Sequence, residues 1–249
     1  MTENSEPIIT IDGPAASGKS TTARRVAARM GWLYLDTGAM YRALALKALR
    51  DGIDLNDCRA IAEMALDTDI RLEQSSGGAR IFLNGKEVTD EIRTPEVDAA
   101  VGPVCEVPEV RESMVALQRE MGRNGGVVAE GRDMGTVVFP GAELKFYMQA
   151  SIEARARRRQ LDFMRQGRRV NVDQLKQEIE KRDFRDSTRH HSPLKQADDA
   201  ELIDTSEMTV DEQVERIIQR IQEFDRTRNR HSIHNSPVCE KGEGIDSHH

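Results

Sequence analysis

One stretch near the start of the chain reads Ile8-Ile9-Thr10-Ile11-Asp12-Gly13-Pro14-Ala15-Ala16-Ser17-Gly18-Lys19-Ser20-Thr21. It begins with an apolar, β-branched run, turns through two glycines and ends in Lys-Ser-Thr where a helical pattern starts. This is the pattern G-x-x-x-x-G-K-[ST] in the strand–loop–helix setting that it requires. Backbone N–H groups of such a loop form an anion-binding concavity, and the dipole of the following helix strengthens it. The stretch therefore predicts binding of nucleoside triphosphate phosphates rather than an ordinary tight turn.

Two side chains at the end of this loop have separate predicted roles. Lys19 can reach the β- and γ-phosphates, and the Ser20 hydroxyl can ligate a magnesium ion. The full set of residues expected to bind the phosphates is Gly13, Pro14, Ala15, Ala16, Ser17, Gly18, Lys19, Ser20 and Thr21.

Composition narrows the class of protein. The chain has 249 residues, a net charge of −7 and a pI of about 5.5, so a nucleic acid is not expected as its main partner. No apolar run approaches the length of a membrane span, and no signal-peptide pattern opens the chain. The three cysteines form no C-x-x-C pair, which predicts a reducing, cytoplasmic setting. We also expect a monomer.

The order of the expected elements indicates an α/β fold with a parallel sheet. The phosphate loop is followed by a helix over residues 20–30, an apolar strand at 32–35 and a helix that ends near Arg50. Further apolar strands are expected at 127–129, 144–148 and 202–203. Strands that alternate with helices in this way form a layered α/β domain.

Residues 69–89 do not fit a parallel sheet. They carry two turn signals, Gly77-Gly78 and Asn84-Gly85, between short alternating runs, and Asn-Gly is typical of a type I′ hairpin. We expect three short antiparallel strands here, near 70–73, 80–83 and 87–88, as an insertion. Three prolines punctuate the next segment of the chain, and a helix is expected over 109–121, with Pro108 suited to its first position.

The C-terminal third is expected to be mainly helical. Ser151 is a candidate N-cap for an arginine-rich helix that ends near Gly167, and Asn171 starts another helix through Arg182. A capping box, Thr209-Val210-Asp211-Glu212, opens a last helix that ends near Phe224. Beyond it the composition predicts disorder, and a metal site at His231, His234 and Cys239 is only weakly indicated.

Three groups of polar residues carry the candidate chemistry. The carboxyl ends of parallel strands meet at one edge of a sheet. We therefore expect three segments to converge there: the phosphate loop, Asp36-Thr37-Gly38 and Gly131-Arg132-Asp133. Alternatively, Arg132 and Asp133 could form a surface salt bridge. Arg182, Asp186 and Arg189 share one helical face, either in a site or as a solvated surface. The arginines of 155–169 could cover a triphosphate, bind RNA or solvate a helix.

Together these groups favour transfer of a phosphoryl group between two nucleotides. Such a transfer needs in-line positioning, Mg²⁺ and several cations around the developing charge, but little covalent help from the protein. An enzyme of this kind needs arginines around both phosphate groups and must exclude water.

Five motifs of one family occur in that family's order. They read Gly13-Pro14-Ala15-Ala16-Ser17-Gly18-Lys19-Ser20, Asp36-Thr37-Gly38-Ala39-Met40-Tyr41-Arg42, Glu91-Ile92-Arg93-Thr94, Glu130-Gly131-Arg132-Asp133-Met134-Gly135-Thr136-Val137-Val138-Phe139-Pro140 and Arg182-Asp183-Phe184-Arg185-Asp186. The motif G-R-D-M-G-T-V-V-F-P is highly specific, whereas the phosphate loop alone is not. From about residue 8 to 224 the chain closely resembles the bacterial cytidylate kinases (CMP kinases), nucleoside monophosphate kinases of the P-loop class.

The resemblance implies a fold and a reaction. The fold is a P-loop NTPase fold: a five-stranded parallel sheet flanked by helices, an inserted monophosphate-binding domain with a small antiparallel sheet, and a mobile lid. The kinase domain would cover 7–224, with the insertion at about 37–120, the lid at about 155–172 and a disordered tail at 225–249. The implied reaction is ATP + CMP to ADP + CDP, with dCMP as a second acceptor and Mg²⁺ as the cofactor.

The resemblance also implies roles for individual residues. Those that it places in catalysis are Lys19, Arg132, Arg158 and Arg159, the last two as arginines of the lid. Those that it places around the acceptor nucleotide are Thr37 and Arg42 near the phosphate, Arg111 and Asp133 at the base, Arg132 and Arg189 as phosphate-binding arginines, and Arg182 and Asp186 at the ribose. A carboxylate such as Asp133 suits the exocyclic amine of cytosine, where uracil has a carbonyl.

One position departs from the family pattern. A serine that touches the base is replaced here by Gly102, which precedes Pro103. We expect that base contact to be absent or made by water, which bears on discrimination against UMP. Two other interpretations remain: another kinase on the same fold, for adenylate, uridylate or shikimate, and a GTPase switch. The insertion and G-R-D-M-G-T-V-V-F-P speak against the first, and the lack of N-K-x-D speaks against the second.

Overall fold

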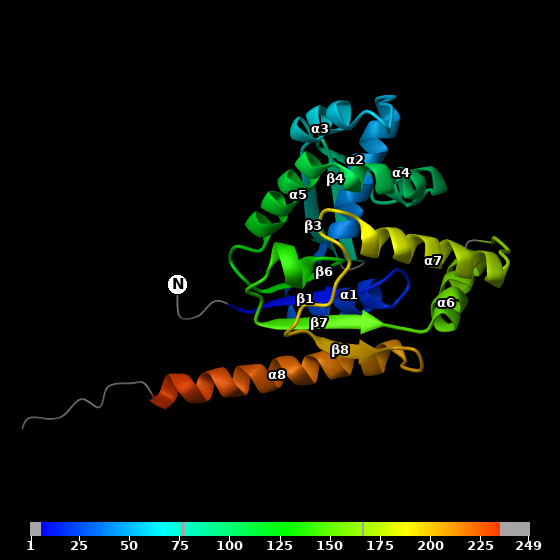
Figure 1. Cartoon of the computed structure of the whole chain (residues 1–249). Helices are drawn as coiled ribbons and strands as arrows, with labels where there is room; N and C mark the ends of the chain where they lie inside the picture. Colours follow the sequence, from blue (N-terminus) through cyan, green and yellow to red (C-terminus); the bar gives the residue numbers. More distant parts are fainter. Residues whose placement is uncertain (1–5, 76–77, 166, 235–249) are drawn as a thin grey trace, which may run out of the picture.

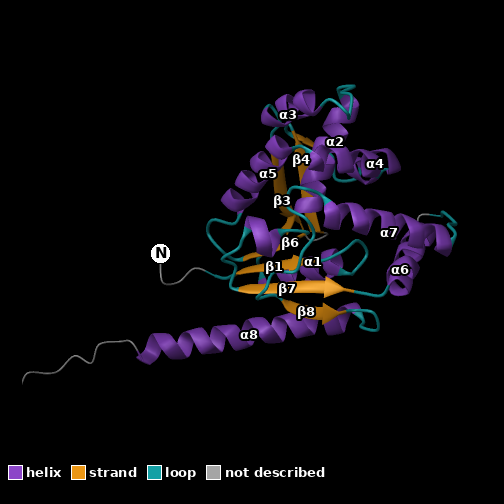
Figure 2. Ribbon diagram, viewed as in Figure 1, coloured by secondary structure: helices purple, strands orange, loops and turns teal. Residues whose placement is uncertain are grey.

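A five-stranded parallel sheet lies at the centre of the molecule (Figures 1 and 2). The computed structural model describes residues 6–75, 78–165 and 167–234, with side chains as far as Arg228. The strand order is β2-β6-β1-β7-β8, and every neighbouring pair is parallel, as the sequence predicted. The strands are β1 (Ile8–Asp12), β2 (Leu33–Asp36), β6 (Val127–Gly131), β7 (Leu144–Gln149) and β8 (Glu201–Asp204).

Helices cover both faces of this sheet, because its strands are apolar on both sides. Val128 of β6 packs with Ile9 and Ile11 against helices α1 (Lys19–Met30) and α8 (Val210–His234). Val127 and Ala129 point to the other face, into the core beneath α2 (Thr37–Arg50) and α5 (Pro108–Met121). No helix in the described part of the chain is long and apolar enough to cross a membrane.

The insertion between β2 and β6 is present as expected. Its antiparallel sheet has the order β3-β4-β5, and the turn at Asn84 and Gly85 has positive φ at both residues, as a type I′ hairpin requires. The other predicted turn involves Gly77, which lies outside the described residues. The elements of the insertion are α3 (Cys58–Leu66), β3 (Ile70–Ser75), β4 (Gly78–Leu83), β5 (Lys86–Glu87), the 3₁₀ turn Glu91–Arg93 and α4 (Pro95–Glu106).

Two helices of the insertion were not predicted. The three prolines suggested only punctuation, yet α4 begins at Pro95, where a missing N–H costs nothing, and it includes Pro103. The Thr94 hydroxyl caps α4 by accepting from the Val97 N–H. Helix α3 has a similar cap, in which the Asp57 carboxylate accepts from the Ala60 N–H at 3.0 Å.

Helices α6 (Ile152–Arg165) and α7 (Val172–Thr188) form a hairpin beyond the carboxyl end of β7 (Figure 1). Ser151 caps α6 as predicted, since its hydroxyl accepts from the Ala154 N–H at 3.2 Å. The two helices share a small apolar cluster of Ala156, Leu175 and Ile179, separate from the main core. Helix α7 extends six residues beyond the predicted end at Arg182, to Thr188. It carries Arg182 and Asp186, but Arg189, expected on the same helical face, lies just past its end where the backbone turns extended.

The expectation of disorder from Asp225 onward is wrong for residues 225–234. Helix α8 opens at the predicted capping box, where the Thr209 hydroxyl and the Glu212 carboxylate bond each other's backbone N–H groups. It then continues ten residues past Phe224 to His234, although its last part lacks an apolar stripe. The suggested metal ligands His231, His234 and Cys239 lie outside the residues whose side chains are described.

Candidate active site

A cavity of about 990 Å³ opens at the carboxyl ends of β1, β2 and β6, the edge at which the three polar groups were expected to meet. In the described part of the chain, twelve lysine and arginine side chains and eight aspartate and glutamate side chains line it, although the whole chain carries −7. Such a locally positive cleft suits a polyanion. The predicted site residues that line it are Ala15, Ala16, Gly18, Lys19, Ser20, Thr21, Thr37, Arg42, Arg111, Arg132, Asp133, Arg158, Arg159, Arg182, Asp186 and Arg189.

Three predicted phosphate-loop residues do not line the cavity but shape the loop. A Cβ on Gly13, whose φ is +151°, would lie 2.1 Å from the Met148 carbonyl oxygen, so only glycine fits there. Pro14 accepts a hydrogen bond at its carbonyl from the Lys19 ammonium, at 3.1 Å. Ser17 is fully buried, and its hydroxyl has no hydrogen-bond partner among the described residues.

Lys19 sits at the floor of the cavity beside a buried carboxylate. Its Nζ lies 3.9 Å from Glu130 Oε2, and both side chains are almost fully buried. Burial, followed by repulsion from Arg132, lowers the pKa of Lys19 to about 7, although Glu130 opposes this shift. A triphosphate beside this ammonium would favour its charged form, so Lys19 is suited to respond to a polyanionic ligand.

The residues around Ser20 fit a magnesium ion. Ser20 lines the cavity next to Glu130 and Asp36, and the three provide hard oxygen donors. Among the described residues, no cluster of three or more His, Cys, Asp or Glu could hold a metal without other ligands. Mg²⁺ commonly binds through few protein groups together with substrate phosphates and water.

A buried aspartate ties the phosphate loop to the Gly131-Arg132-Asp133 segment. Asp12, at the end of β1, accepts hydrogen bonds from the backbone N–H groups of Met134 and Gly135, at 2.9 and 2.8 Å. These residues open a π-helical turn, Met134–Val138. Burial raises the pKa of Asp12 to about 6, against the lowering effect of the two N–H bonds. Asp12 thus fixes Arg132 and Asp133 relative to the loop.

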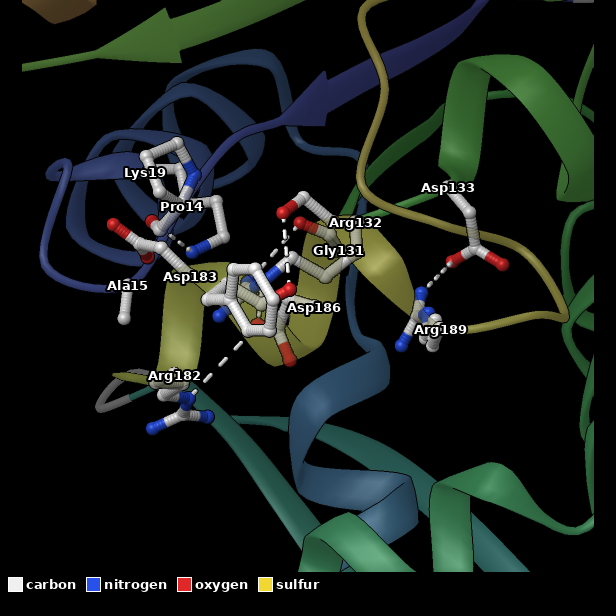
Figure 3. Close-up of polar contacts among 12 residues, drawn as sticks. Pro14, Ala15, Lys19, Gly131, Arg132, Asp133, Arg182, Asp183, Asp186 and Arg189 are labelled. Atoms are coloured by element: carbon white, nitrogen blue, oxygen red, sulfur yellow. Dashed lines mark hydrogen bonds and ion pairs between the residues drawn. The ribbon is translucent and has the colours of Figure 1, made fainter. Parts of the chain in front are cut away.

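The Arg132 side chain, just after β6, contacts residues of α7. Its Nε donates to Asp186 Oδ2 at 2.8 Å, and Arg182 Nε lies 4.0 Å from the same oxygen (Figure 3). Burial, followed by the charges of Arg132 and Arg42, lowers the pKa of Arg182 to about 10. Burial alone would raise the pKa of Asp186, but the charge and hydrogen bond of Arg132 outweigh it, so the pKa is lowered. This face of α7 is therefore part of the cavity wall and not a solvated surface.

A second buried pair closes the other end of the cavity. Arg111 of α5 donates to the Asp133 carboxylate, and the two side chains are only 5% and 4% exposed. The Arg111 guanidinium also lies over the Tyr41 ring, 5.4 Å from its centroid. Arg189 Nη2 lies 4.0 Å from Asp133 Oδ1 (Figure 3). Three buried polar atoms here, the Tyr41 hydroxyl, Arg111 Nε and Arg189 Nη2, have no hydrogen-bond partner among the described residues, so they could bond a polar ligand.

The remaining predicted residues connect the insertion and the α6–α7 hairpin to the core. Arg42 and Arg159 share one carboxylate, Asp98 of α4, at 3.1 and 3.4 Å. Arg158 donates to the carbonyls of Ser17, at 3.3 Å, and Thr205. Thr37 donates to the Glu130 carbonyl at 2.7 Å. Arg158 of α6 therefore reaches the phosphate loop, whereas Arg159 pairs with the insertion.

The comparisons with known proteins agree with this geometry. The model of the family described as cytidylate kinase matches residues 9–223. The chain belongs to the cytidylate kinase family. It is 51% identical over 219 residues to a cytidylate kinase of Pelotomaculum thermopropionicum, covering 88% of this chain and 97% of that one. Its identity over 218 residues is 52% to a cytidylate kinase of Desulforamulus reducens and 47% to one of Shouchella clausii, with the same coverage.

Several residues that complete this cytidylate kinase site were not predicted from the sequence. Asp12 and Glu130 stand inside quoted motifs, and their place at strand ends was the only available signal. Asp98 lies in the unpredicted helix α4. Arg155, which belongs to the predicted arginine group of 155–169, donates to the Ala15 carbonyl at 3.3 Å and to Asp183, an unpredicted contact that tethers α6 to both the loop and α7. Only the tertiary structure identifies these partners.

Proposed function

We propose that this cytidylate kinase transfers the γ-phosphoryl group of ATP to the phosphate of CMP or dCMP, giving CDP or dCDP and ADP. One observation carries the proposal. A single segment, Gly131-Arg132-Asp133, runs from the buried Arg111–Asp133 pair at one end of the cavity to Lys19 and the phosphate loop at the other, and Asp12 bonds the turn that follows it. The Arg111–Asp133 pair would bind the base and the phosphate loop would bind the triphosphate, with Arg132 between them.

The base end supports a preference for cytosine. The Asp133 carboxylate can accept a hydrogen bond from the exocyclic amine of cytosine, and Arg111 beside it can donate to the ring nitrogen next to that amine. Uracil would place a carbonyl oxygen against the carboxylate and would leave buried groups unpaired. The ribose would lie along Arg182 and Asp186 of α7.

The phosphate end supports the transfer itself. Lys19, Arg158 and Arg159 would hold the triphosphate, while Arg42, Arg189 and Thr37 would hold the acceptor phosphate. Arg132 stands between the two and can stabilise the charge that develops on the transferring group. A new bond forms from an acceptor phosphate oxygen to the γ-phosphorus, and the bond to the bridging oxygen of ADP breaks. The attacking oxygen is already an anion, so no general base is required.

Mg²⁺ would be held by Ser20 together with phosphate oxygens, where it supplies charge neutralisation. We further propose that 37–120 serves as the monophosphate-binding region and that 155–172 acts as a lid that closes over ATP and excludes water. The two bonds from Arg155 and Arg158 to the loop carbonyls support such a closure. We further propose that the enzyme is a monomer and acts in the cytoplasm.

The test is ADP release with Mg·ATP and a panel of acceptors: CMP, dCMP, UMP, AMP, GMP and shikimate, each beside a control without acceptor. We expect fast turnover with CMP and dCMP and far slower turnover with UMP. Faster turnover with AMP, GMP or shikimate would contradict the proposal, and acceptor-independent nucleotide binding alone would favour a switch.

A further inference from the structure

Gly102 occupies an unusual place for a glycine. It lies inside α4, buried, with ordinary helical backbone angles, so the backbone does not require glycine there. Glycine in a helix interior is destabilising relative to alanine. The reason for it must be found in the space that a side chain would fill.

That space is filled by an arginine from another helix. A Cβ on Gly102 would lie 2.5 Å from Arg185 Nη1 and 3.0 Å from Arg185 Cζ, closer than such atoms can approach. The guanidinium of Arg185, on α7, therefore lies directly against the bare backbone of α4. Both residues line the nucleotide cavity.

The Arg185 guanidinium is free to bind a ligand. Arg42, Arg111 and Arg132 each donate to a carboxylate. By contrast, no hydrogen bond or ion pair links the Arg185 side chain to another residue in the described part of the chain. It carries only donors, so it can recognise only an acceptor.

The position of Arg185 indicates which part of the nucleotide it meets. Four residues further along the chain, just past the end of α7, Arg189 reaches to within 4.0 Å of Asp133, the carboxylate proposed to read the base. On α4, Cys105 stands one turn from Gly102 and lines the same end of the cavity. Arg185 thus faces the base end, and not the triphosphate end.

We propose that Arg185 donates a hydrogen bond to the ring carbonyl oxygen O2 of the bound pyrimidine, and that Gly102 is present to admit this guanidinium. This inference rests on the proposed function. Asp133 and Arg111 engage the amine and the adjacent ring nitrogen, and O2 is the next acceptor along that edge. Cytosine and uracil share this oxygen, so Arg185 selects pyrimidines as a class, while Asp133 selects cytosine among them.

The first test is Arg185→Ala, assayed with CMP, dCMP and UMP as acceptors and with ATP varied separately. We expect KM to rise by about tenfold for CMP and dCMP, with the CMP-to-UMP ratio of kcat/KM and the KM for ATP unchanged. Lys181→Ala is the matched control, because Lys181 is an exposed cation on the same helix that does not line the cavity. It should leave all these constants unchanged.

The second test separates this role of Gly102 from another. Glycine would also relieve crowding before Pro103, in which case Gly102→Ala would have the same effect whatever residue 185 is. If Gly102 admits Arg185, then Gly102→Ala raises KM for CMP in the wild-type background and has little further effect in Arg185→Ala. Melting temperatures of all variants establish that they are folded.

Three outcomes would overturn the inference. The first is an Arg185→Ala enzyme with unchanged KM for CMP. The second is an Arg185→Ala enzyme whose KM rises for CMP but not for dCMP, which would assign the residue to the ribose 2′-hydroxyl. The third is an equal effect of Gly102→Ala in both backgrounds. Each requires that the wild type turns over CMP. Absence of that turnover would instead refute the proposed function.

Discussion

The buried pair Arg111–Asp133 allows a prediction in which the effect of a substitution on stability can be measured apart from its effect on activity. Its two side chains are 5% and 4% exposed, so Asp133→Ala would leave a guanidinium buried without its carboxylate. Breaking such a pair costs about 3–5 kcal/mol, since the remaining charge is desolvated and unpaired. For a chain of this length each kcal/mol lowers the melting temperature by about 2–4 °C, which gives a drop of roughly 6–20 °C. Arg189, 4.0 Å from Asp133, loses a partner as well, which favours the upper half of that range.

Replacing both partners should have the opposite effect on stability. In Arg111→Met with Asp133→Leu the unpaired charge of Arg111 is removed together with the desolvation cost of the ion pair, and only Arg189 still lacks its partner. We expect this double variant to recover most of the lost melting temperature while it stays inactive with CMP. Thermal unfolding followed by circular dichroism, beside the ADP-release assay, measures both quantities.

Two results would refute this reasoning. If Asp133→Ala melted within about 2 °C of the wild type, the pair would not be a desolvated one. If the double variant were as unstable as the single variant, the instability would come from lost packing and not from an unpaired charge.

Three further predictions concern the phosphate loop. Asp12→Asn keeps the shape of the side chain but can accept only one of the two N–H bonds that hold the π-helical turn. The free energy of unfolding should therefore fall by about 1–2 kcal/mol, and kcat with CMP should fall as well. An unchanged kcat would show that Asp12 does not position the neighbouring motif. Folding lowers the pKa of Lys19 from 10.5 to about 7. Between these two pH values the unfolded chain binds more protons than the folded one, so Lys19 makes the free energy of unfolding rise with pH across that window. ATP binding near pH 8 should therefore take up protons, as calorimetry in buffers of different ionisation enthalpy would measure, and an uptake of zero would contradict the lowered pKa. Gly13→Ala should abolish triphosphate binding, because its Cβ would lie 2.1 Å from the Met148 carbonyl oxygen. Gly31→Ala is the control, since Gly31 has a φ of +72° but open space around it. It should lower the free energy of unfolding by only about 1 kcal/mol and leave triphosphate binding intact.

Local chemistry explains which parts of the fold could be predicted from the sequence. The phosphate loop, the Asn84-Gly85 turn and the cap at Ser151 are short-range signals, and each lies where it was expected. Helix α4 was missed because its prolines suggested interruption, although Pro95 stands at the one helical position that favours it. The extension of α8 past Phe224 was missed because its composition predicts disorder.

The site was predictable as a set of motifs but not as a set of contacts. The rule that parallel strands end at one edge was enough to bring Lys19 and Arg132 together. The partners of these residues depend on long-range packing: Asp12 bonds a turn more than a hundred residues away, and Asp98 lies in the helix that was not foreseen. The departure at Gly102 was visible in the sequence, but its contact with Arg185 was not.

The most direct measurement of the central proposal tracks the transferred group itself. The enzyme would be incubated with CMP and ATP labelled at the γ-phosphate, and the products separated. Transfer to the acceptor predicts that the label appears in the β-phosphate of CDP, in step with the formation of ADP. Label released as inorganic phosphate, with CMP recovered unchanged, would contradict it.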